Sequence, residues 1–96
     1  MKCLLVGEIQ VLDAGQWARY KTMVPETLKP YRAKVLFRGS TDPVLSEQGQ
    51  GHDLVIIEFP DADSIRRWNE SPEYQALIPI REAAAEIRLT AYRATG

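Results

Sequence analysis

Residues 53–75 read DLVIIEFPDADSIRRWNESPEYQ, and this stretch decides the fold because it predicts a buried strand that leads directly into a helix. The strand half is an unbroken apolar run from Leu54 to Ile57, rich in β-branched side chains, which is typical of a strand with both faces covered. Pro60 stops the strand, and Asp61 is a favoured N-cap because its carboxylate accepts from the free N–H groups of a first helical turn. The stretch therefore predicts a strand that ends at Phe59 and a helix that starts after Asp61.

The helix half carries its own internal break. Ile65 and Trp68 recur three residues apart, so the helix has one apolar face. Residues 71–73, SPE, form a second start signal, with serine as N-cap, proline at the first helical position and an acid in the first turn. We therefore expect the helix to break near residues 69–71 and to restart there.

The rest of the chain supplies three more strands and a first helix. Alternation of apolar and polar residues predicts strands over residues 3–11, 32–39 and 88–93. Asp13 is an N-cap candidate, and apolar residues follow it at three- and four-residue steps over about four turns. These residues are Trp17, Tyr20, Val24, Leu28 and Tyr31. Because proline removes a helical hydrogen bond, Pro25 predicts a bend or a restart inside this helix.

The order of the elements predicts the architecture. Residues 40–52 are rich in Gly, Pro, Ser and Asp and predict a long hairpin loop, and Pro79 opens a last helical segment. The order is βαββαβ, the ferredoxin-like pattern of α+β proteins, with a four-stranded antiparallel sheet, strands one and three central, and the helices on one face. We expect residues 1–96 to form one domain of this kind, since a chain of this length supports a single small core.

Two helices on one side leave the other side of the sheet bare. Alternation assigns to the helix side Cys3, Leu5, Ile9, Val11, Val35, Phe37, Val55, Ile57, Phe59 and Leu89. It assigns to the bare side the aliphatic residues Leu4, Val6, Leu36, Leu54 and Ile56, together with Glu8, Lys34, Arg38, Glu58, Arg88 and Tyr92. Five large aliphatic side chains left in water would forgo about 8–15 kcal/mol as an upper estimate. We therefore expect a homodimer in which two copies pack sheet to sheet, as a two-fold contact needs only one self-complementary patch.

Antiparallel pairing also predicts which charges lie level on the bare side. We expect Lys34 to lie level with Glu58, and both Arg38 and Arg88 to lie on the row of Glu8, so that opposite charges compensate one another across strands.

The bulk composition narrows the class of partner. Charged residues make up 26% of the chain, the formal net charge is -1 and no run of like charge occurs, so neither a nucleic-acid nor an anionic-membrane footprint is visible. The apolar N-terminal stretch meets Glu8 too early for a signal peptide or a membrane span. The one cysteine, Cys3, excludes an internal disulfide. These features predict a cytoplasmic protein with no nucleic-acid or membrane partner.

One part of the chain resembles a known family. Residues 57–85 contain Glu58-Phe59-Pro60, Trp68, the motif SPEYQ at residues 71–75, and Arg81, and this combination is similar to domain of unknown function 1330. A weaker similarity covers Tyr20, Pro25 and Arg38-Gly39. The chain departs from the family where it reads Arg32-Ala33 in place of a Gly pair, and it lacks a terminal Glu-Gly. The resemblance implies a ferredoxin-like subunit of a dimeric α/β barrel, in a family with no established reaction.

Charged residues of the bare side are the first candidates for chemistry. Glu8, Glu58, Arg38 and Arg88 would line a polar pocket inside a dimer, where a desolvated carboxylate can move a proton and an arginine can hold an anion. The alternative is an ion-pair network that sets the orientation of the two copies. His52 is the one histidine; it is either a general base at neutral pH or an ordinary exposed residue.

Aromatic residues are the second candidates. Tyr20, Trp68 and Tyr74 either wall a ligand cavity or, at helical spacing, form plain core. Arg81 either grips a carboxylate or bonds a carbonyl at a broken helix end. No second histidine and no cysteine cluster accompanies His52, so we predict no metal and no cofactor.

Two functions from different classes follow. The first is a homodimeric protein that either binds a small apolar or anionic metabolite or, as a cofactor-free enzyme, acts on it by proton transfer or monooxygenation, with Glu8, His52 and Glu58 as catalytic residues. Its ligand-binding residues are Tyr20, Arg38, Trp68, Tyr74 and Arg81. The second is a non-catalytic dimerisation or regulatory module whose bare sheet face is its whole function.

Overall fold

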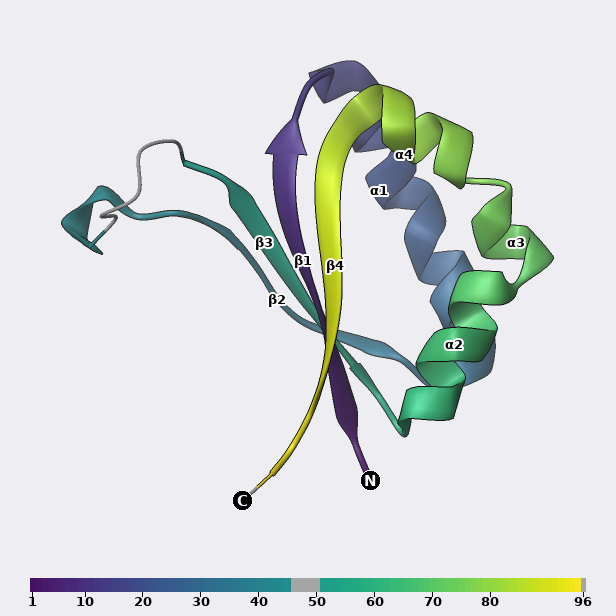
Figure 1. The fold of residues 1–96 in the computed structure, drawn as a ribbon. Helices are drawn as coiled ribbons and strands as arrows, with labels where there is room; N and C mark the ends of the chain where they lie inside the picture. The colour runs from purple at the N-terminus through teal and green to yellow at the C-terminus, as the bar shows by residue number, and fades with distance from the viewer. Residues whose placement is uncertain (46–50, 96) are drawn as a thin grey trace.

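The computed structural model describes residues 1–45 and 51–95 and confirms the βαββαβ order (Figure 1). The strands are β1 (Cys3–Val11), β2 (Lys34–Ser40), β3 (Asp53–Phe59) and β4 (Ala85–Arg93). The helices are α1 (Ala14–Leu28), α2 (Ala62–Glu70), α3 (Pro72–Gln75) and α4 (Ile78–Ala84), with 3-10 turns η1 (Lys29–Tyr31) and η2 (Pro43–Leu45). Part of the predicted hairpin loop, residues 46–50, lies outside the described residues.

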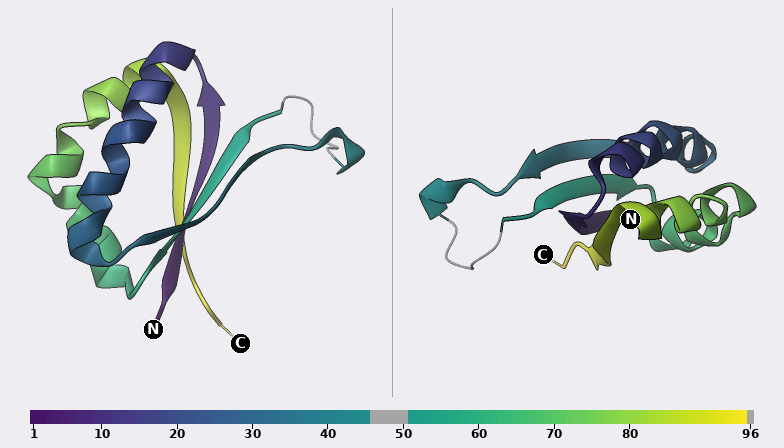
Figure 2. Two further views of the ribbon diagram at one scale, coloured as in Figure 1. Left: turned by 180° about the vertical axis from the view of Figure 1, so that it is seen from behind. Right: turned by 90° about the horizontal axis from the view of Figure 1, so that it is seen from above.

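The four strands form one antiparallel sheet in the order β2-β3-β1-β4, so strands one and three are central as predicted. All four helices lie on one side of this sheet and leave the other side uncovered (Figures 1 and 2). The fold is therefore the ferredoxin-like one, with two layers and a single core between them.

The predicted helix starts are confirmed by their caps. Asp13 and Asp61 each accept a hydrogen bond from the backbone N–H three residues further on, at 3.0 and 2.8 Å. The hydroxyl of Ser71 does the same at 3.2 Å, which ends α2 and begins α3 at the predicted break. The predicted restart at Pro25 is wrong, because α1 runs through this residue without interruption.

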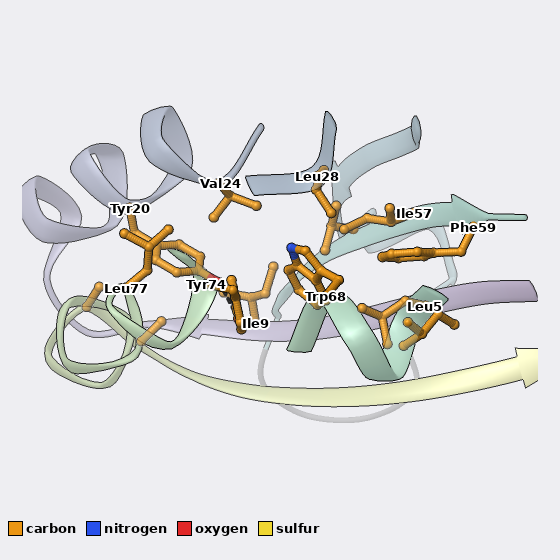
Figure 3. Packing of buried hydrophobic residues seen from close by; sticks show 14 of the residues in the cluster. Leu5, Ile9, Tyr20, Val24, Leu28, Ile57, Phe59, Trp68, Tyr74 and Leu77 are labelled. Carbon is orange, nitrogen blue, oxygen red and sulfur yellow. Dashed lines mark hydrogen bonds between the residues drawn. The ribbon is translucent and has the colours of Figure 1, made fainter. Parts of the chain in front are cut away.

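The core lies between the helices and the covered side of the sheet (Figure 3). Phe59 and Tyr74 are 0% exposed and Trp68 is 2% exposed, so the strand end, α2 and α3 are joined through aromatic packing. The rings of Trp68 and Tyr74 lie 4.0 Å apart, and those of Phe59 and Trp68 5.7 Å apart. The stretch of residues 53–75 thus supplies the three most deeply buried large side chains.

A β-bulge at Leu36 changes the predicted faces of β2. Val35 pairs with Ile57, but the next pair along the ladder is Phe37 with Ile56, so one extra residue lies in β2. A bulge of this kind reverses the alternation for all residues beyond it. Phe37, predicted on the helix side, therefore lies on the bare side and is 52% exposed. Arg38, predicted on the bare side and on the row of Glu8, pairs with Val55 and lies on the helix side.

The sheet is split at one end. The ladder between β1 and β3 stops at Ile9 and Asp53, whereas the ladder between β1 and β4 continues to Val11. Towards this end the hairpin of β2 and β3 diverges from β1 and from the helices (Figures 1 and 2). We call this place the fork, and it opens space on both sides of the sheet.

Candidate functional site

The bare face is the uncovered side of the sheet, and it combines apolar with charged residues. Its members from the described strands are Leu4, Val6, Glu8, Lys34, Phe37, Leu54, Ile56, Glu58, Arg88, Thr90 and Tyr92. Phe37 and Tyr92 are 52% and 55% exposed, whereas the aliphatic residues of the two central strands are half-buried by their neighbours. Large apolar side chains that gather on one face mark a surface suited to contact with another protein.

The predicted charge rows are confirmed in part. Lys34 pairs in register with Glu58, and Arg88 pairs with Glu8. The ion pair that Glu58 makes is with Lys2, at 3.5 Å between Nζ and Oε1. Among residues 1–45 and 51–95, no salt bridge joins Glu8 to Arg88.

A hollow of about 410 Å³ lies at the fork where the bare face ends; we call it the end hollow. Its walls come from β1, from β4 and from the residue before β3, and they consist of Glu8, Ile9, Gln10, His52, Glu86, Ile87 and Arg88. Two of the three predicted catalytic residues, Glu8 and His52, are thus brought to one place. Glu58 is not, because it lies five residues along β3 from Asp53 at the end of the ladder, beside Lys2.

A second space lies at the same fork on the opposite side of the sheet; we call it the helix-side cleft. It has a volume of about 220 Å³ and is bounded by α1, β2 and the ends of β1 and β3. Its walls are Ile9, Trp17, Lys21, Arg38, Ser40 and Asp53, together with Gly39 and Leu54. Arg38 reaches this cleft because of the bulge at Leu36.

The predicted aromatic wall is packed into the core. Trp68 donates from its indole nitrogen to the Thr27 hydroxyl at 3.0 Å, and Tyr20 and Tyr74 share a hydrogen bond of 2.7 Å between their hydroxyls. Trp68 also forms part of an apolar groove of about 400 Å³ between α2 and β4, with Leu5 and Leu89.

Arg81 completes a buried polar group with the two tyrosines. Its Nη1 donates to the Tyr74 hydroxyl at 2.8 Å, and its guanidinium lies 5.9 Å from the centre of the Tyr74 ring. Burial, and then the neighbouring Tyr74 hydroxyl, raise the pKa of Tyr20, so this side chain stays protonated. The group joins α1, α3 and α4, and it gives the SPEYQ motif and Arg81 a common structural role.

Arg38 is the one wall of the helix-side cleft that was predicted as a site residue; the polar and aromatic walls that were not predicted are Trp17 and Lys21 on α1, and Ser40 and Asp53 on the hairpin. The spacing of Trp17 and Lys21 is a signal that was available, since residues four apart share one helix face. The bulge leaves no such signal in the alternation of apolar and polar residues, so the position of Arg38 beside them does not follow from the sequence.

No group of three or more His, Cys, Asp or Glu side chains in residues 1–45 and 51–95 is arranged to hold a metal ion. None of the helices in the described part of the chain has the length and apolar character needed to cross a membrane.

Comparisons with known proteins agree with this fold. The model of a family described as "Domain of unknown function (DUF1330)" matches residues 2–95. No curated protein matches the chain. Among solved structures, the RPA0582 protein of unknown function from Rhodopseudomonas palustris is similar with a TM-score of 0.82 and 16% identity, over 99% of this chain and 83% of that one.

Two other similar structures have informative descriptions. SnoaB from Streptomyces nogalater, a cofactor-independent oxygenase, has a TM-score of 0.70 and 14% identity, over 99% of this chain and 94% of that one. A dimeric ferredoxin-like protein of unknown function from Thermobifida fusca has a TM-score of 0.65 and 14% identity, over 98% of this chain and 92% of that one. With sequence identities this low, the structural similarity shows a shared fold and does not show a shared function.

Proposed function

Because the chain belongs to the DUF1330 family, whose model covers residues 2–95, we propose that it is a homodimer that binds a small metabolite at the fork of its sheet. The observation that carries the proposal is that an apolar bare face runs directly into a hollow lined by Glu8, His52 and Arg88. The first part of this surface suits a second copy of the chain, and the second part suits a ligand.

The homodimer rests on the exposed apolar residues of the bare face. Phe37 is 52% exposed and Tyr92 is 55% exposed, and a sheet-to-sheet contact would remove both from water. In a two-fold contact, the bare face of one subunit would pack against the same face of the other subunit. The description of the Thermobifida fusca protein as dimeric is in keeping with such an assembly on this fold.

The ligand site rests on the end hollow. Its volume of about 410 Å³ falls in the range of about 300–1,000 Å³ that is usual for small-molecule pockets. Arg88 supplies a guanidinium that suits an anionic group, and Glu8 and His52 are side chains able to accept a proton. A partner that covers the bare face would reduce the access of water and strengthen these interactions.

The proposal also includes a class of reaction. Glu8 and His52 in one hollow favour proton transfer, as in an isomerase, and the similarity to a cofactor-independent oxygenase extends the proposal to monooxygenation. Glu58, Arg38, Tyr20, Trp68, Tyr74 and Arg81 are not part of this hollow. We place the protein in the cytoplasm.

A second function is favoured by the packing of the aromatic residues. Tyr20, Tyr74 and Arg81 are satisfied by one another in a core without need of a ligand. The chain would then be a dimerisation or regulatory module, and the bare face would be its functional surface.

Sedimentation equilibrium tests the dimer. The wild type is expected to have twice the mass of the 10.9 kDa chain at micromolar concentration, and Phe37→Glu is expected to sediment as a monomer. Val44→Glu is the matched control, because Val44 is 88% exposed in η2, outside the sheet, and this variant should stay dimeric. A wild-type monomer would refute the dimer.

Nuclear magnetic resonance tests the ligand site. Small carboxylic acids are titrated into labelled dimer, and the amide signals of residues 8, 52 and 88 are expected to move together. Arg88→Gln and His52→Ala should weaken this binding, whereas Arg19→Gln at an exposed position of α1 should not. If no acid moves these signals, the protein is better described as the non-catalytic module.

A further inference from the structure

We propose that the helix-side cleft is a second binding site, and that it takes a small organic acid with a carboxylate, a hydroxyl or amino donor, and an apolar body. The cleft lies on the opposite side of the sheet from the end hollow, and the two spaces share only Ile9 among their walls. It therefore stands independently of the homodimer and of its ligand.

Two cations on facing elements define the acid group of the ligand. Lys21 comes from α1 and Arg38 from β2, and both line the cleft. Within the described parts of the chain, neither makes a salt bridge to a carboxylate. A ligand carboxylate between them would receive charge-assisted hydrogen bonds from both walls.

Asp53 defines the donor group of the ligand. The Ser40 hydroxyl donates to its Oδ1 at 2.7 Å, which fixes the carboxylate at the mouth of the hairpin. A hydroxyl or amino group on the ligand can donate to the remaining acceptor positions of this carboxylate. With two cations and one carboxylate, the lining has a net charge near +1, which favours a monoanion over a phosphate dianion.

Trp17 and Ile9 define the apolar body. The Trp17 ring is held by stacking on Tyr20, at 5.4 Å between ring centres and 23° between planes, and Tyr20 is held in turn by its hydrogen bond to Tyr74. This wall is therefore in place before a ligand arrives, which lowers the entropy cost of binding. The volume of about 220 Å³ is below the usual range for drug-sized ligands, so it suits a compact acid better than a nucleotide.

The probes are mandelate, phenylacetate, benzyl alcohol and inorganic phosphate. Mandelate carries carboxylate, hydroxyl and ring; phenylacetate lacks the hydroxyl, and benzyl alcohol lacks the carboxylate. The chain has two tryptophans, so its indole N–H signals report the location of binding. Mandelate is expected to move the signal of Trp17 and to leave that of Trp68, which lies 2% exposed in the core, in place.

Substitutions on the two walls have matched controls. Lys21→Met and Arg38→Met are each expected to weaken mandelate binding about tenfold, the effect of losing one hydrogen bond to a charged group. Arg19→Met on α1 and Lys34→Met on the bare face of β2 remove the same charge from the same elements and should leave binding unchanged. Asp53→Asn is expected to bind phenylacetate more tightly than the wild type does, because the repelling charge is gone.

The proposal is overturned if mandelate binds no more tightly than benzyl alcohol or phosphate, or if the controls weaken it as much as the cleft variants. The test of the helix-side cleft can be separated from the test of the end hollow. Monomeric Phe37→Glu and the variant His52→Ala should both retain mandelate binding at the cleft, and loss of binding in either would contradict the assignment of the site to the helix side.

Discussion

Tyr74→Phe is the sharpest test of the core, because it removes one oxygen atom from the centre of the buried polar group and keeps the ring. The Tyr74 hydroxyl shares a hydrogen bond of 2.7 Å with Tyr20 and accepts one of 2.8 Å from Arg81. The ring itself is 0% exposed and packs 4.0 Å from Trp68, so the substitution leaves the apolar contacts as they are. What is lost is hydrogen bonding alone.

The magnitude follows from the two bonds. A neutral hydrogen bond contributes about 0.5–1.5 kcal/mol and one to a charged group about 1.5–3 kcal/mol. Arg81 is only half-buried and water can replace part of its loss, so we expect the variant to lose about 2–4 kcal/mol of unfolding free energy. In a chain of this size each kcal/mol lowers the melting temperature by about 4–8 °C, which gives a fall of about 8–30 °C.

Urea unfolding and calorimetry measure this loss. Tyr31→Phe is the control, since the Tyr31 hydroxyl makes no hydrogen bond within the described residues, and it should stay within about 0.5 kcal/mol of the wild type. The double variant Tyr20→Phe/Tyr74→Phe should recover part of the loss, because it also removes the hydroxyl left without a partner. A Tyr74→Phe variant as stable as Tyr31→Phe, or strictly additive losses in the double variant, would refute the reasoning.

Three further variants have defined outcomes. Burial, and then Tyr74, raise the pKa of Tyr20 above its usual 10.0, so above pH 10 the unfolded chain releases a proton that the folded chain keeps. The free energy of unfolding should therefore fall above pH 10 by up to about 1.4 kcal/mol per pH unit. In urea titrations Tyr20→Phe should reduce this pH dependence, and an equal dependence in the variant and the wild type would contradict the prediction. Gly7→Ala should lose about 1–3 kcal/mol in the same assay, because its Cβ would lie 2.9 Å from Val55 Cγ1, and an unchanged midpoint would show that Val55 moves freely. Ser71→Ala should lose about 1 kcal/mol, as its hydroxyl caps α3 and donates to a carbonyl of α2 at 2.7 Å, and a loss confined to the noise would mean that another group takes over the cap.

Most of the fold follows from local rules that need no partner. Asp13, Asp61 and Ser71 cap helices through side-chain atoms that lie within three residues, so their positions in the sequence were sufficient to predict the helix starts. The faces of β1 and β3 follow from the alternating direction of successive side chains, since no register shift interrupts the pairing of these two strands. At Pro25 the alternative of a restart was wrong, because α1 continues past this residue although its ring removes one helical hydrogen bond.

The candidate sites were less predictable because they depend on pairing between distant strands. The end hollow exists where β3 leaves β1, and nothing local to Glu8 or to His52 signals that the ladder stops at Ile9. Arg38 was placed on the wrong side because the bulge at Leu36 is a property of the pairing of β2 with β3. Local patterns thus predict where helices and strands run, and the spaces between them require the assembled sheet.

The extra residue at position 36 also bears on how relatives of this chain should be aligned. A homologue one residue shorter between Val35 and Phe37 would keep every later side chain on its present side, because Phe37 already lies opposite Ile56 without the help of Leu36. An alignment without a gap at this place would shift the residues after Val35 by one position. It would then match the residue equivalent to Arg38 in the homologue with Phe37 of this chain. Length differences at this single place are therefore informative, and a correctly placed gap there decides which arginines in the family are equivalent.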